Sequence, residues 1–151
     1  MNMTRRQIFA LSAGAATYGL FAFAPSRAFA NVEATQEALA AFTGGTEPQA
    51  GTISLTAPEI AENGNTVPIS VTVESPMTED SYVESVTILA EGNPNPEVAT
   101  FYFTPMSGSA TATTRIRLAQ TQNVIAVAKM NDGSVFSDRK EVKVTIGGCG
   151  G

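Results

Sequence analysis

The residue of this chain that is best suited to a chemical reaction is a cysteine near the carboxyl end, whose side chain is a thiol. Cys149 is the only cysteine, and it stands between two glycine pairs in the terminal sequence Gly-Gly-Cys-Gly-Gly, residues 147–151. A thiolate is a nucleophile and forms disulfide-type bonds with other sulfur atoms. Glycine loses more conformational entropy than any other residue when it is held still, so the sequence predicts a mobile arm. The three steps from Ile146 to Cys149 span roughly 10 Å when extended.

Two less specific interpretations of these residues are a frayed chain end and a buried structural cysteine. Glycine neighbours offer no side chains that could bury the sulfur of Cys149, and a frayed end has no need of a cysteine. We therefore expect Cys149 to be a functional thiol that the chain presents to other molecules, with Gly147, Gly148, Gly150 and Gly151 as its flexible arm.

The composition excludes several kinds of active site. The chain has no histidine and one cysteine, so its own residues cannot build the usual zinc, haem or copper ligand sets. A nucleophile paired with a histidine base is excluded for the same reason, and no carboxylates stand at the spacing of a calcium loop. We therefore expect no cofactor and no metal.

The first thirty residues have the pattern of an export signal, followed by a cleavage site. Arg5 and Arg6 form a twin-arginine motif, and a weakly apolar stretch follows over residues 8–24. A membrane-spanning helix needs about 20 apolar residues, which favours a cleaved signal over an uncleaved anchor. Ala28 and Ala30 form a small-x-small cleavage site, so we expect the mature chain to comprise residues 31–151.

The mature chain has the length of one domain. It keeps six basic and fourteen acidic residues, a net charge of −8, which does not favour nucleic acid or an anionic membrane surface. Thiols outside the cytoplasm tend to be oxidised, and a lone cysteine cannot close a disulfide within its chain. We expect Cys149 to pair with another molecule or to remain a reactive thiol.

The sequence of the mature chain predicts a short helix followed by strands. Residues 31–42 favour a helix, which Gly44 and Gly45 end. Alternation of apolar and polar residues predicts strands at 52–55, 67–73, 82–90, 98–104, 110–118, 123–129 and 135–146. Turn signals stand at 62–65, 93–96 and 131–134. About seven short strands predict an all-β, immunoglobulin-like antiparallel β-sandwich over residues 31–146.

One predicted strand and the predicted helix suggest surface that needs a cover. Residues 123–129 are apolar on both faces, as in a central strand. Val32, Leu39 and Phe42 fall near one face of the helix. In a chain of this size, we expect part of that apolar surface to be covered by a partner protein.

The end of the chain, residues 142–151, closely resembles the carboxyl terminus of the SoxY family, the sulfur-compound carriers of the bacterial Sox thiosulfate-oxidising system. Three interior stretches are similar to the same family, namely residues 60–68, 93–96 and 114–122. The terminal Gly-Gly-Cys-Gly-Gly is highly specific, whereas the interior matches are individually weak. The twin-arginine signal also fits the family.

The resemblance implies a periplasmic carrier, exported by the twin-arginine pathway, that forms a heterodimer with a companion β-sandwich subunit, SoxZ. A c-type cytochrome complex would join thiosulfate oxidatively to Cys149 as an S-thiosulfonate. A dimanganese thiohydrolase would then release sulfate and leave a persulfide. In some lineages a molybdenum sulfur dehydrogenase oxidises that sulfur further. The carrier itself would catalyse none of these steps.

Two other classes of protein stay open. One is the small β-fold sulfur carrier whose carboxyl-terminal Gly-Gly is activated as a thiocarboxylate, here on Gly151. The export signal argues against it because that activation uses ATP, and so does the cysteine. The other is an exported immunoglobulin-like structural or interaction module, tethered to its partner by a stable intermolecular disulfide through Cys149.

Overall fold

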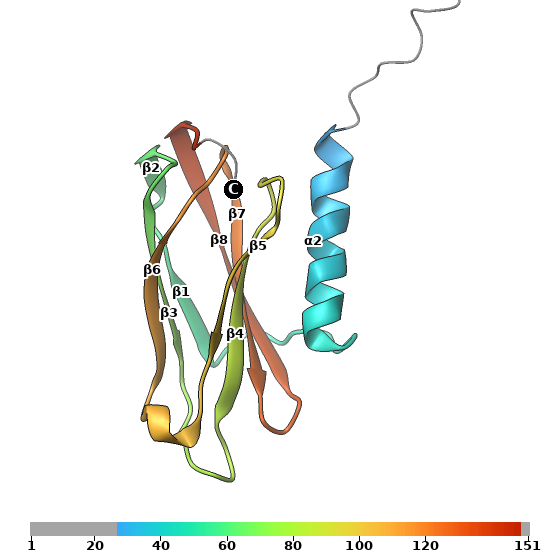
Figure 1. The fold of residues 1–151 in the computed structure, drawn as a ribbon, viewed down its shortest axis with the longest axis vertical. Helices are drawn as coiled ribbons and strands as arrows, with labels where there is room; N and C mark the ends of the chain where they lie inside the picture. The colour runs from blue at the N-terminus through green and yellow to red at the C-terminus, as the bar shows by residue number, and fades with distance from the viewer. Residues whose placement is uncertain (1–26, 149–151) are drawn as a thin grey trace, which may run out of the picture.

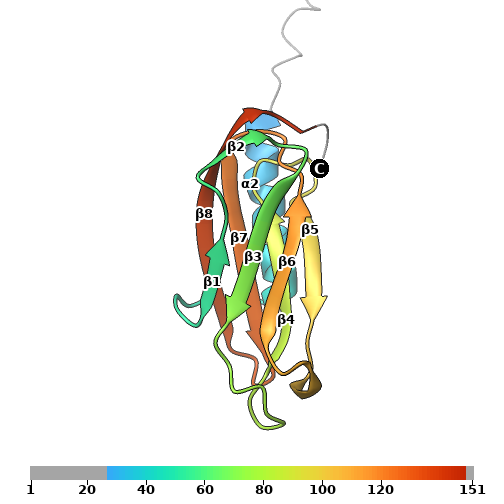
Figure 2. The ribbon, with the colours of Figure 1, turned by 90° about the vertical axis from the view of Figure 1, so that its left-hand side faces the viewer.

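In the computed structural model, residues 27–148 are described, and they form a two-layered β-sandwich with one helix outside it (Figure 1). A three-stranded sheet has the order β1-β3-β6, and a five-stranded sheet has the order β2-β8-β7-β4-β5. Figure 2 shows the three-stranded sheet in front of the five-stranded one. The elements are α2 (Arg27–Thr43), β1 (Ile53–Thr56), β2 (Ile60–Asn63), β3 (Val67–Val73), β4 (Val83–Ala90), β5 (Glu97–Tyr102), the 3-10 turn η1 (Pro105–Ser107), β6 (Ala110–Ile116), β7 (Gln122–Met130) and β8 (Val135–Ile146).

The all-β sandwich expected from the sequence is confirmed, with one strand more than the seven predicted. The extra strand is β2, whose residues we had assigned in part to a turn. It is short, and Ala61 is its one buried residue, so it shows no clear alternation. It also pairs in parallel with β8, through Ala61 and Val144 among others, whereas every other pair of these strands is antiparallel.

The main core lies between the two sheets. Strand β3 shows the pattern best, because its alternate residues point inward and are buried: Val67, Ile69, Val71 and Val73. Alternation of this kind is what places every second side chain of a strand on one face of the sheet. Leu118, just after β6, is fully buried in the same core. The segment that follows β6 is therefore anchored by an apolar side chain.

A second, smaller core lies on the outer face of the five-stranded sheet, where α2 covers it (Figure 1). Its buried members are Leu89, Ile125, Val127 and Val135, and the helix adds Ala38, Leu39 and Phe42. The prediction that β7 is a central strand with two apolar faces is confirmed. The helix of the same chain covers the outer face of this strand, so that face needs no partner protein, and the expectation that the domain takes a partner stays a prediction. Val32 is 49% exposed and lies outside this cluster.

Helix α2 begins at Arg27, four residues before the predicted start, and ends at Thr43. Gly44 and Gly45 follow with φ of 66° and 87°, a left-handed conformation that glycine adopts without strain and that commonly ends helices. Both therefore act as the predicted stop. No helix within residues 27–148 is long and apolar enough to cross a membrane.

The contact between α2 and the sheet gives a stability prediction. We expect replacement of both Leu39 and Phe42 by alanine to lower the free energy of unfolding by about 2 kcal/mol, because half-buried apolar surface is lost on both side chains. Urea denaturation followed by circular dichroism measures this. Glu37→Ala, an exposed change on the same helix, is the control and should stay within about 0.5 kcal/mol. Equal midpoints for the two variants would show that the helix does not stabilise the sandwich.

Candidate functional site

The carboxyl-terminal segment leaves β8 at one end of the sandwich and packs against two other backbone segments there. Parallel pairing of β2 with β8 sets Asn63 beside Ile146, so the turn after β2 lies next to the end of β8. The amide of Gly64 donates to the carbonyl of Ile146 (2.7 Å), that of Leu118 to Gly64 (2.8 Å), and that of Gly148 to Leu118 (2.9 Å). We call these four residues, Gly64, Leu118, Ile146 and Gly148, the backbone clasp.

The glycines of the backbone clasp are there because no side chain fits. A Cβ on Gly148 would lie 2.7 Å from the carbonyl oxygen of Gly64, and a Cβ on Gly64 would lie 2.7 Å from the amide nitrogen of Gly148. A Cβ on Gly147 would likewise overlap the carbonyl oxygen of Ala119. None of the three has a left-handed φ. Absence of a Cβ, and not backbone freedom, is what these positions require.

Gly108 shows the opposite situation. It has a φ of 73°, and a Cβ built on it would meet no atom within 4 Å. It needs glycine for its conformation alone. It follows η1, which lies at the lower end of the sandwich in Figure 1, whereas β8 terminates at the upper end.

The structure therefore differs from the predicted arm at its first two residues. Gly148 is buried, and its amide is hydrogen bonded to Leu118. Gly147 is exposed but lies against the backbone of Ala119. Both belong to the packed end of the sandwich. The sequence could not distinguish a glycine that is needed for freedom from one that is needed for close approach.

A buried asparagine holds the middle segment of the backbone clasp in place. The side-chain amide of Asn93 donates to the carbonyl of Arg117 (2.8 Å), and its oxygen accepts from the amide of Ala119 (3.0 Å) and from the side chain of Gln122 (2.9 Å). Asn93 is 1% exposed. It therefore ties the loop after β4 to the residues on both sides of Leu118.

Two further contacts restrain this segment. The side-chain oxygen of Gln122 accepts from the amide of Gly92 at 2.7 Å, and the hydroxyl of Thr121 accepts from the amide of Val144 at 2.9 Å. Sequence reasoning identified residues 93–96 only as a rigid loop and assigned Asn93 no role. The available signal was weak: asparagine in a loop often bonds neighbouring backbone groups.

Most of the residues predicted to carry function lie outside the part of the chain that the structure describes. These are Arg5, Arg6, Cys149, Gly150 and Gly151. Ala28 and Ala30, the predicted cleavage residues, fall in the first turn of α2. Gly147 and Gly148 are the predicted arm residues that the structure places.

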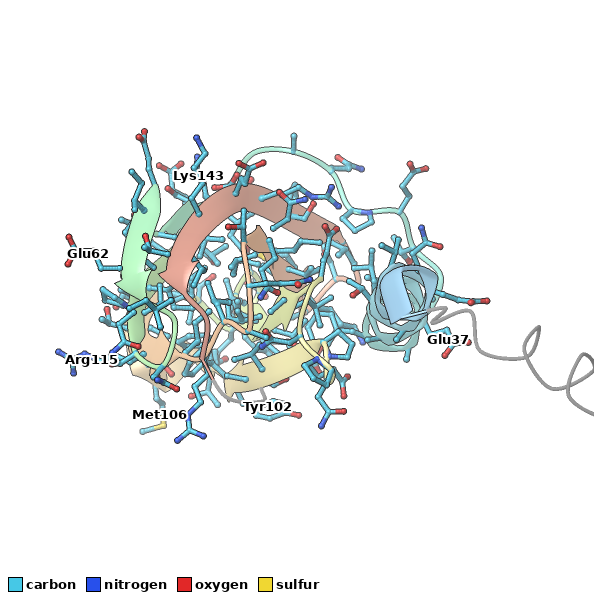
Figure 3. All side chains as sticks on the ribbon, turned by 90° about the horizontal axis from the view of Figure 1, so that it is seen from above. Glu37, Glu62, Tyr102, Met106, Arg115 and Lys143 are labelled. Atoms are coloured by element: carbon cyan, nitrogen blue, oxygen red, sulfur yellow. The ribbon has the colours of Figure 1, made fainter. Side chains whose placement is uncertain are left out.

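The charged side chains of the described residues do not converge on a second site. Viewed from the end at which β8 terminates, Glu62, Arg115 and Tyr102 point away from the sandwich (Figure 3). Glu91 and Arg139 form an ion pair at 2.8 Å on the surface. Within residues 27–148, no three His, Cys, Asp or Glu side chains gather as a metal site would require.

Two open hollows lie on the surface near the loop after β4. The larger, of about 470 Å³, lies between α2 and this loop and has Glu37 and Glu97 in its lining. The smaller, of about 270 Å³, is lined in part by Arg115, Arg117 and Glu97. Neither hollow is lined by a histidine or a cysteine.

Comparison with known proteins identifies one family. The family model described as "Sulfur oxidation protein SoxY" matches residues 39–149, a range that ends on Cys149. The structure of the sulfur carrier protein SoxY from Chlorobium limicola f thiosulfatophilum is 34% identical, with a TM-score of 0.62, and the match covers 76% of this chain and 98% of that one. A sequence comparison with curated proteins gave no match.

More distant structures share the fold alone. Superoxide reductase (neelaredoxin) from Ignicoccus hospitalis is 23% identical over 62% of this chain and 80% of that one, with a TM-score of 0.55. A putative superoxide reductase from Thermotoga maritima is 22% identical over 68% and 89% of the two chains, with a TM-score of 0.52. At this level of identity, the likeness carries no information on activity.

Proposed function

Since the chain belongs to the SoxY family of sulfur oxidation proteins, we propose that it carries sulfur intermediates of thiosulfate oxidation as covalent adducts of Cys149. The observation that carries the proposal is the family match, which runs to Cys149, the only thiol of the chain. A thiol that is alone in its chain cannot be consumed by an internal disulfide, so it remains available to other molecules.

The chemistry of loading and release balances around that thiol. The thiolate of Cys149 and thiosulfate join through a new S–S bond, and two electrons leave to a c-type cytochrome complex. Hydrolysis of the bond between the terminal sulfonate and the neighbouring sulfur then releases sulfate and two protons, and a persulfide remains on Cys149. A dimanganese thiohydrolase supplies this second step, and the carrier supplies the sulfur atom that keeps the intermediate attached.

The remaining chain suits a carrier that catalyses nothing itself. Its cargo is held by a covalent bond, so a net charge of −8 after signal removal does not prevent loading with an anion. The absence of histidine from the sequence removes the usual base for activating a nucleophile. Activation of the thiol and of water therefore falls to partner enzymes.

The partners and the compartment belong to the same proposal. A companion β-sandwich subunit, SoxZ, forms a heterodimer with the carrier, and in some lineages a sulfur dehydrogenase acts on the persulfide. The apolar face beneath α2 is covered within the chain, so the companion binds elsewhere. The site of action is the periplasm, because Arg5 and Arg6 direct twin-arginine export.

Export gives a prediction about the mature amino terminus. We expect protein purified from its host to begin at Asn31, because cleavage follows the small residues Ala28 and Ala30. Amino-terminal sequencing of the periplasmic fraction measures this. Changing Arg5 and Arg6 to lysine, a charge-preserving control, should retain the full-length chain in the cytoplasm. Mature protein in the periplasm of that variant would contradict export through the twin-arginine pathway.

The covalent adduct is tested by the intact mass of protein purified from cells growing on thiosulfate. A carrier should show a mixture of masses above that of the bare chain, and reductant should collapse them to one. Fragment masses should place every adduct on Cys149. Cargo on the Gly151 carboxylate would support a thiocarboxylate carrier instead. A single stable disulfide to one protein would support a structural tether.

A further inference from the structure

The backbone clasp has a consequence for where the cargo is held. The amides of Gly64, Leu118 and Gly148 each donate to a carbonyl of another member, so three stretches of chain far apart in sequence are joined one after another. Leu118 is fully buried in the core, and the side chain of Asn93 bonds its neighbours Arg117 and Ala119. The clasp is therefore attached to the rigid part of the sandwich.

We propose that Gly64 is a positioning residue for the cargo thiol, and that the carrier arm pivots at Gly148 and not at Ile146. This inference rests on the proposed carrier function. With the clasp closed, the α-carbon of Cys149 lies one step, about 3.8 Å, from that of Gly148. With the clasp open, the arm would start at Ile146 and reach roughly 10 Å to the same residue.

A carrier arm that starts at Gly148 changes how a partner enzyme reaches the cargo. Each chain residue that is free before docking and fixed after it has an entropic cost. The clasp fixes Gly147 and Gly148 in advance, so the partner orders fewer residues when it binds. The partner must then dock against the end of the sandwich itself, where the turn after β2 and the segment after β6 lie beside Gly148.

Gly64→Ala opens the clasp by a steric clash. The new Cβ would meet the amide nitrogen of Gly148 at 2.7 Å and a methyl carbon of Val144 at 2.9 Å, and it would overlap the carbonyl oxygen of Leu118. Backbone atoms cannot turn aside as a side chain does, so the segments must separate. Gly108→Ala is the matched control, because it introduces strain of backbone conformation at the opposite end of the sandwich, with no atom nearby.

The first measurement is amide hydrogen exchange, which does not depend on function. In the mature wild-type protein we expect the amides of Gly148 and Leu118 to exchange at least about 100-fold more slowly than in an unstructured peptide. Gly108→Ala should keep that protection at Gly148, and Gly64→Ala should lose most of it. If the amide of Gly148 in the wild type exchanged at the rate of a free peptide, the backbone clasp would not be formed in solution and the proposal would be wrong.

The second measurement is turnover of the thiosulfate-loaded carrier by the thiohydrolase. In Gly64→Ala we expect kcat/KM to fall about tenfold, mainly through KM, because two more residues are ordered on docking. A small thiol reagent should label Cys149 no more slowly than in the wild type. Gly108→Ala should turn over as the wild type does.

A second variant distinguishes the effect of an open clasp from the effect of misfolding, in case Gly64→Ala does not fold. Gly148→Ala lies beyond the last strand, and its Cβ would meet the carbonyl oxygen of Gly64 at 2.7 Å. It should lift the segment off with the sandwich intact. If exchange of the amide at position 148 accelerates in either variant but kcat/KM stays at the wild-type value, the positioning role is wrong and the carrier function stands. A wild-type protein that is never loaded on Cys149 overturns the carrier function, whatever the exchange rates show.

Discussion

Cys149→Ser is expected to abolish both loading with thiosulfate and all turnover by the Sox enzymes, with no change in fold. A serine hydroxyl is a far poorer nucleophile than a thiolate and cannot form an S–S bond. The residue follows β8, which ends at Ile146, so the thermal midpoint should match that of the wild type. Intact mass after incubation with thiosulfate and the cytochrome complex measures loading.

The control for this experiment moves the thiol without removing it. Cys149→Ser combined with Gly151→Cys keeps one thiol on the same chain end. We expect a small reagent to label it and the partner enzymes to use it poorly, because the sulfur has shifted by two residues. Loading of Cys149→Ser to the wild-type extent would show that the sulfur is attached elsewhere, and the carrier proposal in its present form would fail.

Asn93→Ala is expected to give a large loss of stability for a single change outside the apolar core. The asparagine side chain is 1% exposed and makes three hydrogen bonds, a buried one with the side chain of Gln122 and two partly buried ones with the backbone of Arg117 and Ala119. A buried polar group left without a partner costs about 1–3 kcal/mol. We therefore expect a total loss of about 3 kcal/mol and a fall in Tm of about 12 °C.

Asn95→Ala is the matched control, since Asn95 lies in the same loop and is exposed. Its free energy of unfolding should stay within about 0.5 kcal/mol of the wild type. Asn93→Ala should also weaken protection of the Leu118 amide, because the segment that carries Leu118 loses two of its restraints. Equal stability of the two variants would contradict the structural role of Asn93.

Local patterns in the sequence predicted most of the fold. The alternation of Val67, Ile69, Val71 and Val73 predicted β3 with the bounds that the structure has. Asn131 to Ser134 predicted the turn between β7 and β8. In that turn the carboxylate of Asp132 accepts from the hydroxyl and the amide of Ser134 (2.6 and 2.8 Å), and these hydrogen bonds lower the pKa of Asp132. Such features involve neighbours in the chain, so they can be read from a short window.

Strand β2 could not be found in this way, because its stabilising partner lies far along the chain. It pairs in parallel with β8, about eighty residues later, and only Ala61 of its four residues is buried. Helix α2 presented a similar problem. Its apolar stripe was visible, but only the fold shows that Leu39 and Phe42 cover the outer face of the same chain's sheet.

The sequence by itself determined that this protein is a β-sandwich with one thiol, which follows the last strand. It also determined the family resemblance, through the residues around that thiol. Only the tertiary structure shows that Gly147 and Gly148, the first two residues of the predicted arm, pack against other backbone segments at the end of the sandwich. Gly64, Leu118 and Gly148 are widely separated in the chain, and their backbones come together because β2 lies beside β8 and Leu118 is buried in the core. A glycine chosen for its freedom and a glycine chosen because no Cβ fits are the same letter in a sequence, and only the atoms packed around it distinguish them.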